Sequence, residues 1–105
     1  MEISLKKFGF VLSSREAGRE AFAAFQSRLA EVPADERIFI NFDGVHTFSP
    51  SWADEFLTPL NEKFGSRVYL KESENPSVIA TIDLLEKINK FKFKKARAST
   101  NLKRR

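Results

Sequence analysis

The sequence predicts an α/β fold in which a mostly parallel sheet of four to five strands packs against about three helices. Short apolar runs typical of strands alternate along the chain with segments whose apolar residues recur at helical spacing. Two of the helical segments open with a capping residue followed by proline, Ser49-Pro50 and Asn75-Pro76. Because parallel strands need a crossover between them, this repeated order of strand and helix indicates a mainly parallel sheet.

Residues 2–12 have the pattern of a first strand in which the apolar residues change face partway along. Ile3 and Leu5 share one parity, and the later apolar positions share the other: Phe8, Phe10 and Leu12. One extra residue between the two sets, in a bulge or a turn at Lys6-Lys7, would bring both onto the core side.

A first helix is expected over about residues 14–31, since Ser13 and Glu16 have the spacing of a capping box. The next run, residues 37–42, is almost continuously apolar, which is typical of a central strand covered on both faces. A second helix follows from Ser49-Pro50, and its apolar residues form one stripe: Ala53, Phe56, Leu57, Leu60 and Phe64.

The pattern of the remaining residues predicts a third strand, a third helix and a final strand. The third strand covers residues 67–71, and the third helix begins at Asn75-Pro76. Residues 90–94 alternate between lysine and phenylalanine, which predicts a half-buried strand, and lysine on its exposed side is typical of an edge. The domain is therefore expected to cover residues 1–95, followed by a basic, disordered tail over residues 96–105.

The composition narrows the classes of function. The chain has no cysteine and a single histidine, His46, which excludes a disulfide framework, a thiolate zinc site and a cysteine nucleophile. No phosphate-binding or dinucleotide-binding glycine motif occurs, so we expect a protein that is not an enzyme and needs no metal or cofactor. No apolar run approaches the roughly 20 residues of a membrane span or resembles a signal peptide, so a cytoplasmic protein without membrane contact is expected.

The positive charge is concentrated at the C-terminus. Residues 90–105 contain eight basic residues and no acidic one, whereas residues 1–89 contain ten basic residues and all 14 acidic ones. The basic pI, near 9.6, is therefore a property of the C-terminus and not of the whole domain. Binding of nucleic acid through this tail is the alternative function that the sequence suggests.

Residues 38–51 resemble the signature of the STAS fold, which bacterial anti-sigma-factor antagonists use. The shared features are a buried strand ending in a polar residue, a turn carrying Gly44-Val45, and a polar pair that opens a helix. A group of bacterial STAS-like domains of unknown function is a closer match. Its members similarly carry a Ser-Arg pair before the first helix, here Ser14-Arg15, and motifs matched here by residues 41–45 and 51–56. The resemblance covers about residues 2–95, and residues 86–93 resemble the family's last turn and strand.

The resemblance implies a non-catalytic module that binds another protein in a bacterial partner-switching system. The partner would be a histidine-kinase-like ATPase or an anti-sigma factor. Docking would use the loop Asp43–Ser49 and the first turns of the following helix. Family members are phosphorylated on a serine at this helix start, and the matching positions are Ser49 and Pro50. Ser51 and Ser49 are therefore the candidate phosphoacceptors.

Six residues are candidates for partner binding: Asp43, His46, Ser51, Trp52, Glu55 and Arg15. Structural roles compete with this function for several of them. Ser49 and Ser51 could serve only to cap the helix. Trp52 lies beside the apolar stripe of its helix and could be either an exposed interface anchor or partly buried in the core.

Arg15 needs an explanation, because a positive charge at a helix N-terminus opposes the helix dipole. It could form a salt bridge with Asp43 or Asp54, or bind an anionic group of a ligand or partner. Asp43 also fits a simple Asp-Gly turn with Gly44. His46 has neither a second histidine nor a nearby arrangement of serine and acid that would make it catalytic.

Overall fold

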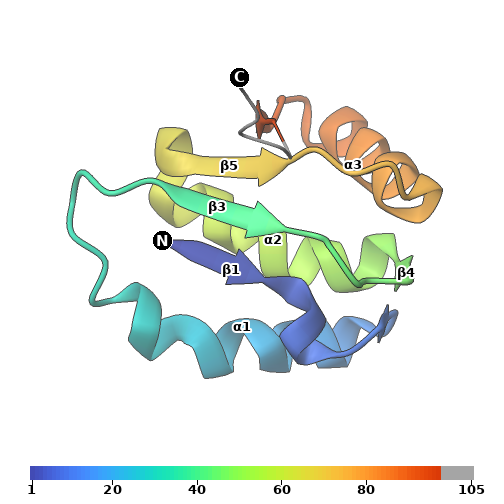
Figure 1. The fold of residues 1–105 in the computed structure, drawn as a ribbon, viewed down its shortest axis with the longest axis horizontal. Helices are drawn as coiled ribbons and strands as arrows, with labels where there is room; N and C mark the ends of the chain where they lie inside the picture. The colour runs from blue at the N-terminus through green and yellow to red at the C-terminus, as the bar shows by residue number, and fades with distance from the viewer. Residues whose placement is uncertain (98–105) are drawn as a thin grey trace, which may run out of the picture.

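The computed structural model describes residues 1–97, and these residues form a four-stranded parallel sheet and three helices (Figure 1). The sheet order is β1 (Glu2–Ser4), β3 (Ile38–Asn41), β5 (Val68–Lys71) and β6 (Lys94–Ala96), and each neighbouring pair is parallel. Two further short strands, β2 (Val11–Leu12) and β4 (Thr47–Phe48), form a small parallel sheet of their own. The predicted fold class is thereby confirmed.

The helices begin at the predicted places. Their bounds are α1 (Arg15–Leu29), α2 (Pro50–Phe64) and α3 (Pro76–Asn89). Ser49 caps α2 and Asn75 caps α3, each side chain accepting a backbone N–H of the first turn. The predicted capping box at Ser13 is wrong, because Ser14 is the N-cap of α1 and accepts the N–H of Ala17 at 3.0 Å.

The phase change in residues 2–12 is a turn, and it ends the first strand early. A short 3₁₀ helix at Leu5–Phe8 separates β1 from β2, so β2 leaves the main sheet and pairs with β4. Leu12 is buried as expected, but Phe10 is 59% exposed, against the prediction that it faces the core. Because β2 lies outside the main sheet, Leu12 is its one core residue, while Ile3 and Leu5 are buried and Phe8 packs against the core as predicted.

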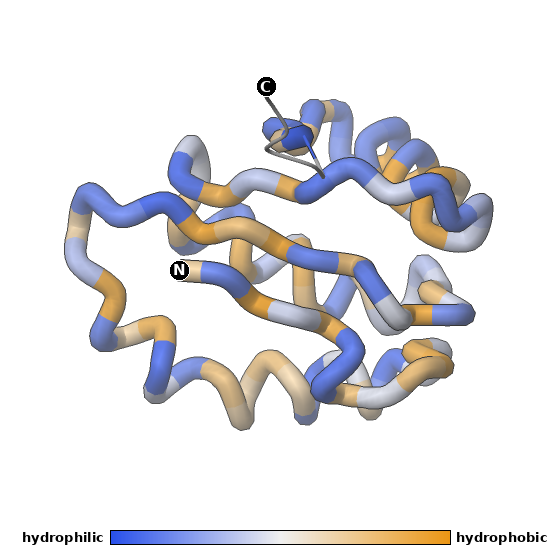
Figure 2. Tube along the Cα trace, viewed as in Figure 1, coloured by the Kyte–Doolittle hydropathy of each residue, from blue (hydrophilic) through white to orange (hydrophobic). Residues whose placement is uncertain are grey.

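All three helices cover the same face of the main sheet. The strands follow one another in chain order across the sheet, and right-handed crossovers then place every helix on one side. In Figure 1 the strands β1, β3 and β5 face the viewer and α2 passes behind them. The prediction that residues 37–42 are covered on both faces is therefore wrong. β3 is apolar from Ile38 to Ile40 and ends in the polar Asn41 (Figure 2), yet only Ile38 and Ile40 are fully buried, while Phe39 is half-buried on the uncovered side.

The last strand is an edge strand, as predicted, but it lies further along the chain. β6 covers Lys94–Ala96 and pairs with β5, whereas Phe93 is buried just before it. β6 thus runs past the predicted domain end at residue 95. The rest of the predicted basic tail, with its suggested binding of nucleic acid, falls on residues 98–105, which lie outside the described residues. No helix of residues 1–97 is long and apolar enough to cross a membrane.

Glu86 holds the turn between α3 and β6. Its buried carboxylate accepts the N–H of Phe93 at 2.8 Å and lies 2.7 Å from the Lys95 ammonium. Burial opposes the charged form, but the hydrogen bonds from Lys95 and from the Phe93 N–H outweigh it, so the pKa of Glu86 is lowered. The charged carboxylate is therefore an anchor for the last strand.

Gly18 allows α1 and α2 to approach closely. A Cβ atom at this position would lie 2.5 Å from the carbonyl oxygen of Trp52 and 3.0 Å from its Cα. Both atoms belong to backbone, so a side chain could be accommodated only by moving one helix. The indole of Trp52 fills the space beside this contact, packing on Phe8, Phe48 and Phe56 at ring-centroid distances of 5.9, 5.9 and 5.1 Å.

We expect Gly18→Ala to lower the free energy of unfolding by at least about 1 kcal/mol, because the helices must separate to admit the methyl group. This loss should occur although alanine is the better helix former. Urea unfolding measures this change in the free energy of unfolding. Ala24→Gly, at an exposed position of the same helix, shows how large the effect of helix propensity alone is. A more stable Gly18→Ala protein would show that the helices are not in contact here.

We expect Glu86→Gln to lower the free energy of unfolding by about 1–3 kcal/mol at neutral pH, because a charge-assisted hydrogen bond is lost inside the protein. A carboxyl whose pKa is lowered by folding stabilises the protein above its unfolded pKa of about 4.3, and this contribution disappears as the pH falls through the folded pKa. The difference in the free energy of unfolding between wild type and variant should therefore disappear at acidic pH. Glu62→Gln, at an exposed position, is the control and should behave as wild type throughout.

Candidate functional site

The predicted partner-binding residues gather around one end of the molecule. The loop after β3 leads into β4 and the start of α2, and β2 leads into the start of α1. Backbone hydrogen bonds join the two segments: the N–H of His46 reaches the Phe10 carbonyl at 2.8 Å, and that of Ser49 reaches the Leu12 carbonyl at 2.9 Å. The small β2–β4 sheet therefore brings the predicted docking loop beside the first helix (Figure 1).

Arg15 is the centre of an ion-pair cluster that links the starts of α1 and α2. Its Nη1 lies 2.7 Å from Glu55 Oε2 and 3.2 Å from Asp54 Oδ2, and Arg19 Nε lies 3.3 Å from Glu55 Oε1. The hydrogen bond from Arg15, with the weaker one from Arg19, lowers the pKa of Glu55. The predicted pairing of Arg15 with Asp54 is confirmed, and the alternative pairing with Asp43 is wrong, since α2 and not the loop supplies the carboxylates.

Ser49 and Ser51 have different surroundings. The hydroxyl of Ser49 donates to the Ser13 carbonyl at 2.6 Å and accepts the Trp52 N–H at 3.2 Å, so it ties the loop before α1 to the first turn of α2. Ser51 lies in that same first turn, is half-buried, and takes no part in these bonds. A modification of Ser49 would break a structural link, whereas one on Ser51 would not.

Trp52 is buried, which decides against the exposed interface anchor and removes this residue from the candidates for partner binding. Its side chain is only 1% exposed and lies in the aromatic cluster between α1, α2 and the sheet. The apolar stripe predicted from the sequence is narrower than the buried side of α2, because this helix contacts the sheet, α1 and α3 at once. Trp52 is a core residue that holds the candidate site in place.

Asp43 and His46 are exposed on the loop between β3 and β4. The N–H of Asp43 donates to the Asn41 side-chain oxygen at 2.9 Å, and Gly44 follows with φ of 88°, which confirms a tight turn with a glycine-specific conformation. The imidazole of His46 stacks on the ring of Phe10, with centroids 5.4 Å apart and planes 23° from parallel.

An exposed apolar patch beside this loop was not anticipated. Phe10 is 59% exposed and Val11 62% exposed, and Val11 pairs with the exposed Thr47 across the small sheet. We call these three residues and His46 the β2–β4 patch. The sequence does contain a signal for it: Phe10, Val11 and Leu12 are consecutive, and consecutive residues of a strand cannot all face the core.

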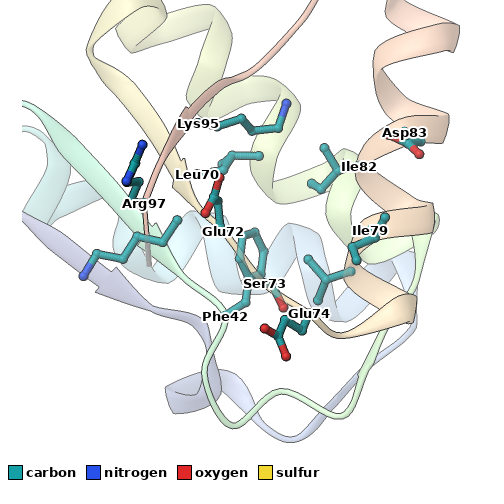
Figure 3. A pocket seen from close by; sticks show the side chains of 12 residues that line it. Phe42, Leu70, Glu72, Ser73, Glu74, Ile79, Ile82, Asp83, Lys95 and Arg97 are labelled. Atoms are coloured by element: carbon teal, nitrogen blue, oxygen red, sulfur yellow. The ribbon is translucent and has the colours of Figure 1, made fainter. Parts of the chain in front are cut away.

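A cavity of about 790 Å³ opens at the carboxyl end of β5, between β6 and the start of α3 (Figure 3). Its apolar side chains include Leu70 from β5 and Ile79 and Ile82 from α3, which face one another across the space. Charged side chains of both signs line it in equal number: Lys71, Lys95, Arg97, Glu72, Glu74 and Asp83. Lys95 is already paired with Glu86 and Lys71 with Glu2. The remaining charged side chains of the lining are Arg97 and three carboxylates, and the described residues include no group of acidic side chains that could hold a metal ion.

Residues 1–97 contain no group of three or more histidine, cysteine or acidic side chains that could hold a metal ion. What the described residues offer instead is a surface: an apolar patch, an exposed loop, a serine in a helix start and an ion-pair cluster beside it. These features suit recognition of another macromolecule.

We expect Arg15→Gln to raise the pKa of Glu55 towards its ordinary value, because the strongest hydrogen bond to that carboxylate is lost. Arg19→Gln should raise it less, since its bond to Glu55 is longer. Carboxyl-carbon NMR titration measures both shifts. Arg28→Gln, at the far end of α1, serves as the control and should leave the Glu55 titration unchanged.

Comparisons with known proteins add no relative to this description. No family model, no curated protein and no solved structure matches the chain.

Proposed function

We propose that this protein is a non-catalytic, cytoplasmic interaction module that docks another protein through the β2–β4 patch and the adjoining loop Asp43–Ser49. The observation that carries the proposal is the pair of adjacent apolar residues, Phe10 and Val11, both more than half exposed beside that loop. A cluster of exposed apolar side chains bordered by polar groups is typical of a protein-binding site. Aromatic residues such as Phe10 are suited to be its anchor.

The start of α2 forms the polar border of this surface. Ser51 and Glu55 replace Trp52 as the contributions of this helix, since the indole is buried and the other two side chains are half-exposed. Arg15 holds Glu55 in position, so the border has a defined arrangement of charges. Such a border sets orientation and the choice of partner more than it sets affinity.

The resemblance of residues 38–51 to STAS domains supports a partner of the histidine-kinase-like ATPase or anti-sigma-factor class. Those residues are the loop and the helix start that adjoin the β2–β4 patch. We include this partner class in the proposal, with competition between partners for one surface as the mechanism.

Phosphorylation of Ser51 is the proposed means of control. The doubly charged group would stand one helical turn before Asp54 and Glu55, where like charges repel each other. It would also make the border of the docking surface strongly negative. Ser49 is the second candidate, but its hydroxyl is engaged with Ser13 and Trp52.

We expect Phe10→Ser to weaken binding of the partner about tenfold or more, because a central aromatic anchor is removed. The partner is first identified in the source organism with a photo-crosslinking amino acid at position 11, and its affinity for the recombinant full-length chain is then measured by calorimetry. Ile88→Ser is the matched control, since Ile88 is 63% exposed but lies on α3. Equal crosslinking from positions 11 and 88, or equal affinity of the Phe10→Ser and wild-type proteins, would contradict the proposal.

A further inference from the structure

The main sheet has one face that none of the described elements covers. The strand register places Glu2, Phe39, Tyr69 and Lys94 side by side in one row across all four strands. A second row on the same face contains Ser4 and Asn41 on neighbouring strands, and Lys71 beside Ala96. We call these residues the open face. Their strand neighbours Ile3, Ile38, Ile40, Val68 and Leu70 point to the other side and belong to the core.

Two aromatic rings lie in the middle of the open face. Phe39 on β3 and Tyr69 on β5 are half-buried neighbours, with ring centroids 5.5 Å apart and planes 30° from parallel. Neither ring belongs to the hydrophobic core or is packed against it. An apolar pair of this kind on the central strands of a bare sheet does not serve the core.

Two cations lie over the Tyr69 ring. Arg37 lies 5.5 Å from the centre of the Tyr69 ring, and the Lys94 ammonium lies 5.7 Å from it. Lys71, by contrast, is neutralised by Glu2 at 2.6 Å. Within residues 1–97 Arg37 and Lys94 are held against an aromatic ring and not by a carboxylate, so the open face has a net positive charge around its aromatic centre.

We propose that the open face binds single-stranded nucleic acid. Aromatic side chains provide stacking platforms for unpaired bases, and flanking cations neutralise the phosphates. Aromatic residues on the two central strands of a four-stranded sheet form such a platform in a common class of RNA-binding domain. A duplex is a poorer fit, because the face of a sheet offers no helix or ribbon that could enter a groove. This surface shares no residue with the β2–β4 patch, and of the basic C-terminal residues it uses Lys94.

The test uses the full chain and a fluorescent single-stranded oligonucleotide of about 12 nucleotides, in RNA and DNA form, at low salt. Fluorescence anisotropy gives the affinity. We expect Tyr69→Leu to weaken binding about tenfold, because a stacking ring is lost, whereas Tyr69→Phe keeps the ring and should bind like wild type. Lys94→Glu should weaken binding and also make it less dependent on salt. Lys87→Glu, an exposed lysine on α3, controls for net charge.

A direct readout complements the affinities. Tyr69 is the only tyrosine of the chain, so ultraviolet crosslinking followed by mass spectrometry should find the nucleotide on the peptide that contains it. The proposal is overturned if Tyr69→Leu binds like Tyr69→Phe, or if only neutralising Lys103, Arg104 and Arg105 abolishes binding, which would assign it to the tail. A wild-type dimer that Lys94→Glu dissociates would also overturn it, since the face would then be occupied by a second copy of the chain.

Discussion

The contact between Gly18 on α1 and the backbone of Trp52 on α2 determines how the site end of the protein is built. Because glycine has no side chain, the two helices touch through backbone atoms at the first turn of α2. The aromatic rings of Phe8, Phe48 and Phe56 then close around the indole of Trp52. Dense packing of this kind leaves the helices a single relative position, because shifting either one opens a void or forces an overlap.

The polar features of the site follow from that packing. With the two helix starts side by side, Arg15 meets Asp54 and Glu55 and not a carboxylate of the loop. The cluster is solvated, so its main effect is to orient charges and not to stabilise the fold. The hydroxyl of Ser49 joins the same two segments through Ser13. Such links would favour docking of the proposed partner, since less conformational entropy is lost on binding when a surface is already held in place.

The one-sided sheet gives the molecule two surfaces of different character. The covered face supplies almost the whole core, while the uncovered face has aromatic rings and cations that the core does not use. The β2–β4 patch lies elsewhere, because the early turn at Leu5–Phe8 removes β2 from the main sheet. The β2–β4 patch and the open face therefore consist of separate residues.

Much of the fold follows from local sequence. The alternation of strand and helix, the caps at Ser49 and Asn75, and the edge position of the last strand are all consequences of residues close together in the chain. The participation of Arg15 in a salt bridge with Asp54 could also be predicted, because the starts of helices in a parallel sheet gather at one edge.

Other features were decided only by tertiary structure. Trp52, Phe10 and Phe39 are all large and apolar. The sequence alone did not decide whether Trp52 is buried, and it predicted the wrong surroundings for Phe10 and Phe39. Periodicity reports which side of an element is apolar, but it does not report how many neighbours cover that element. α2 has neighbours on several sides, so Trp52 is buried. β2 leaves the main sheet, so Phe10 is exposed. β3 is covered on one face only, so Phe39 on its other face is half-buried. Burial depends on these long-range contacts, and the spacing of residues along one segment does not contain them.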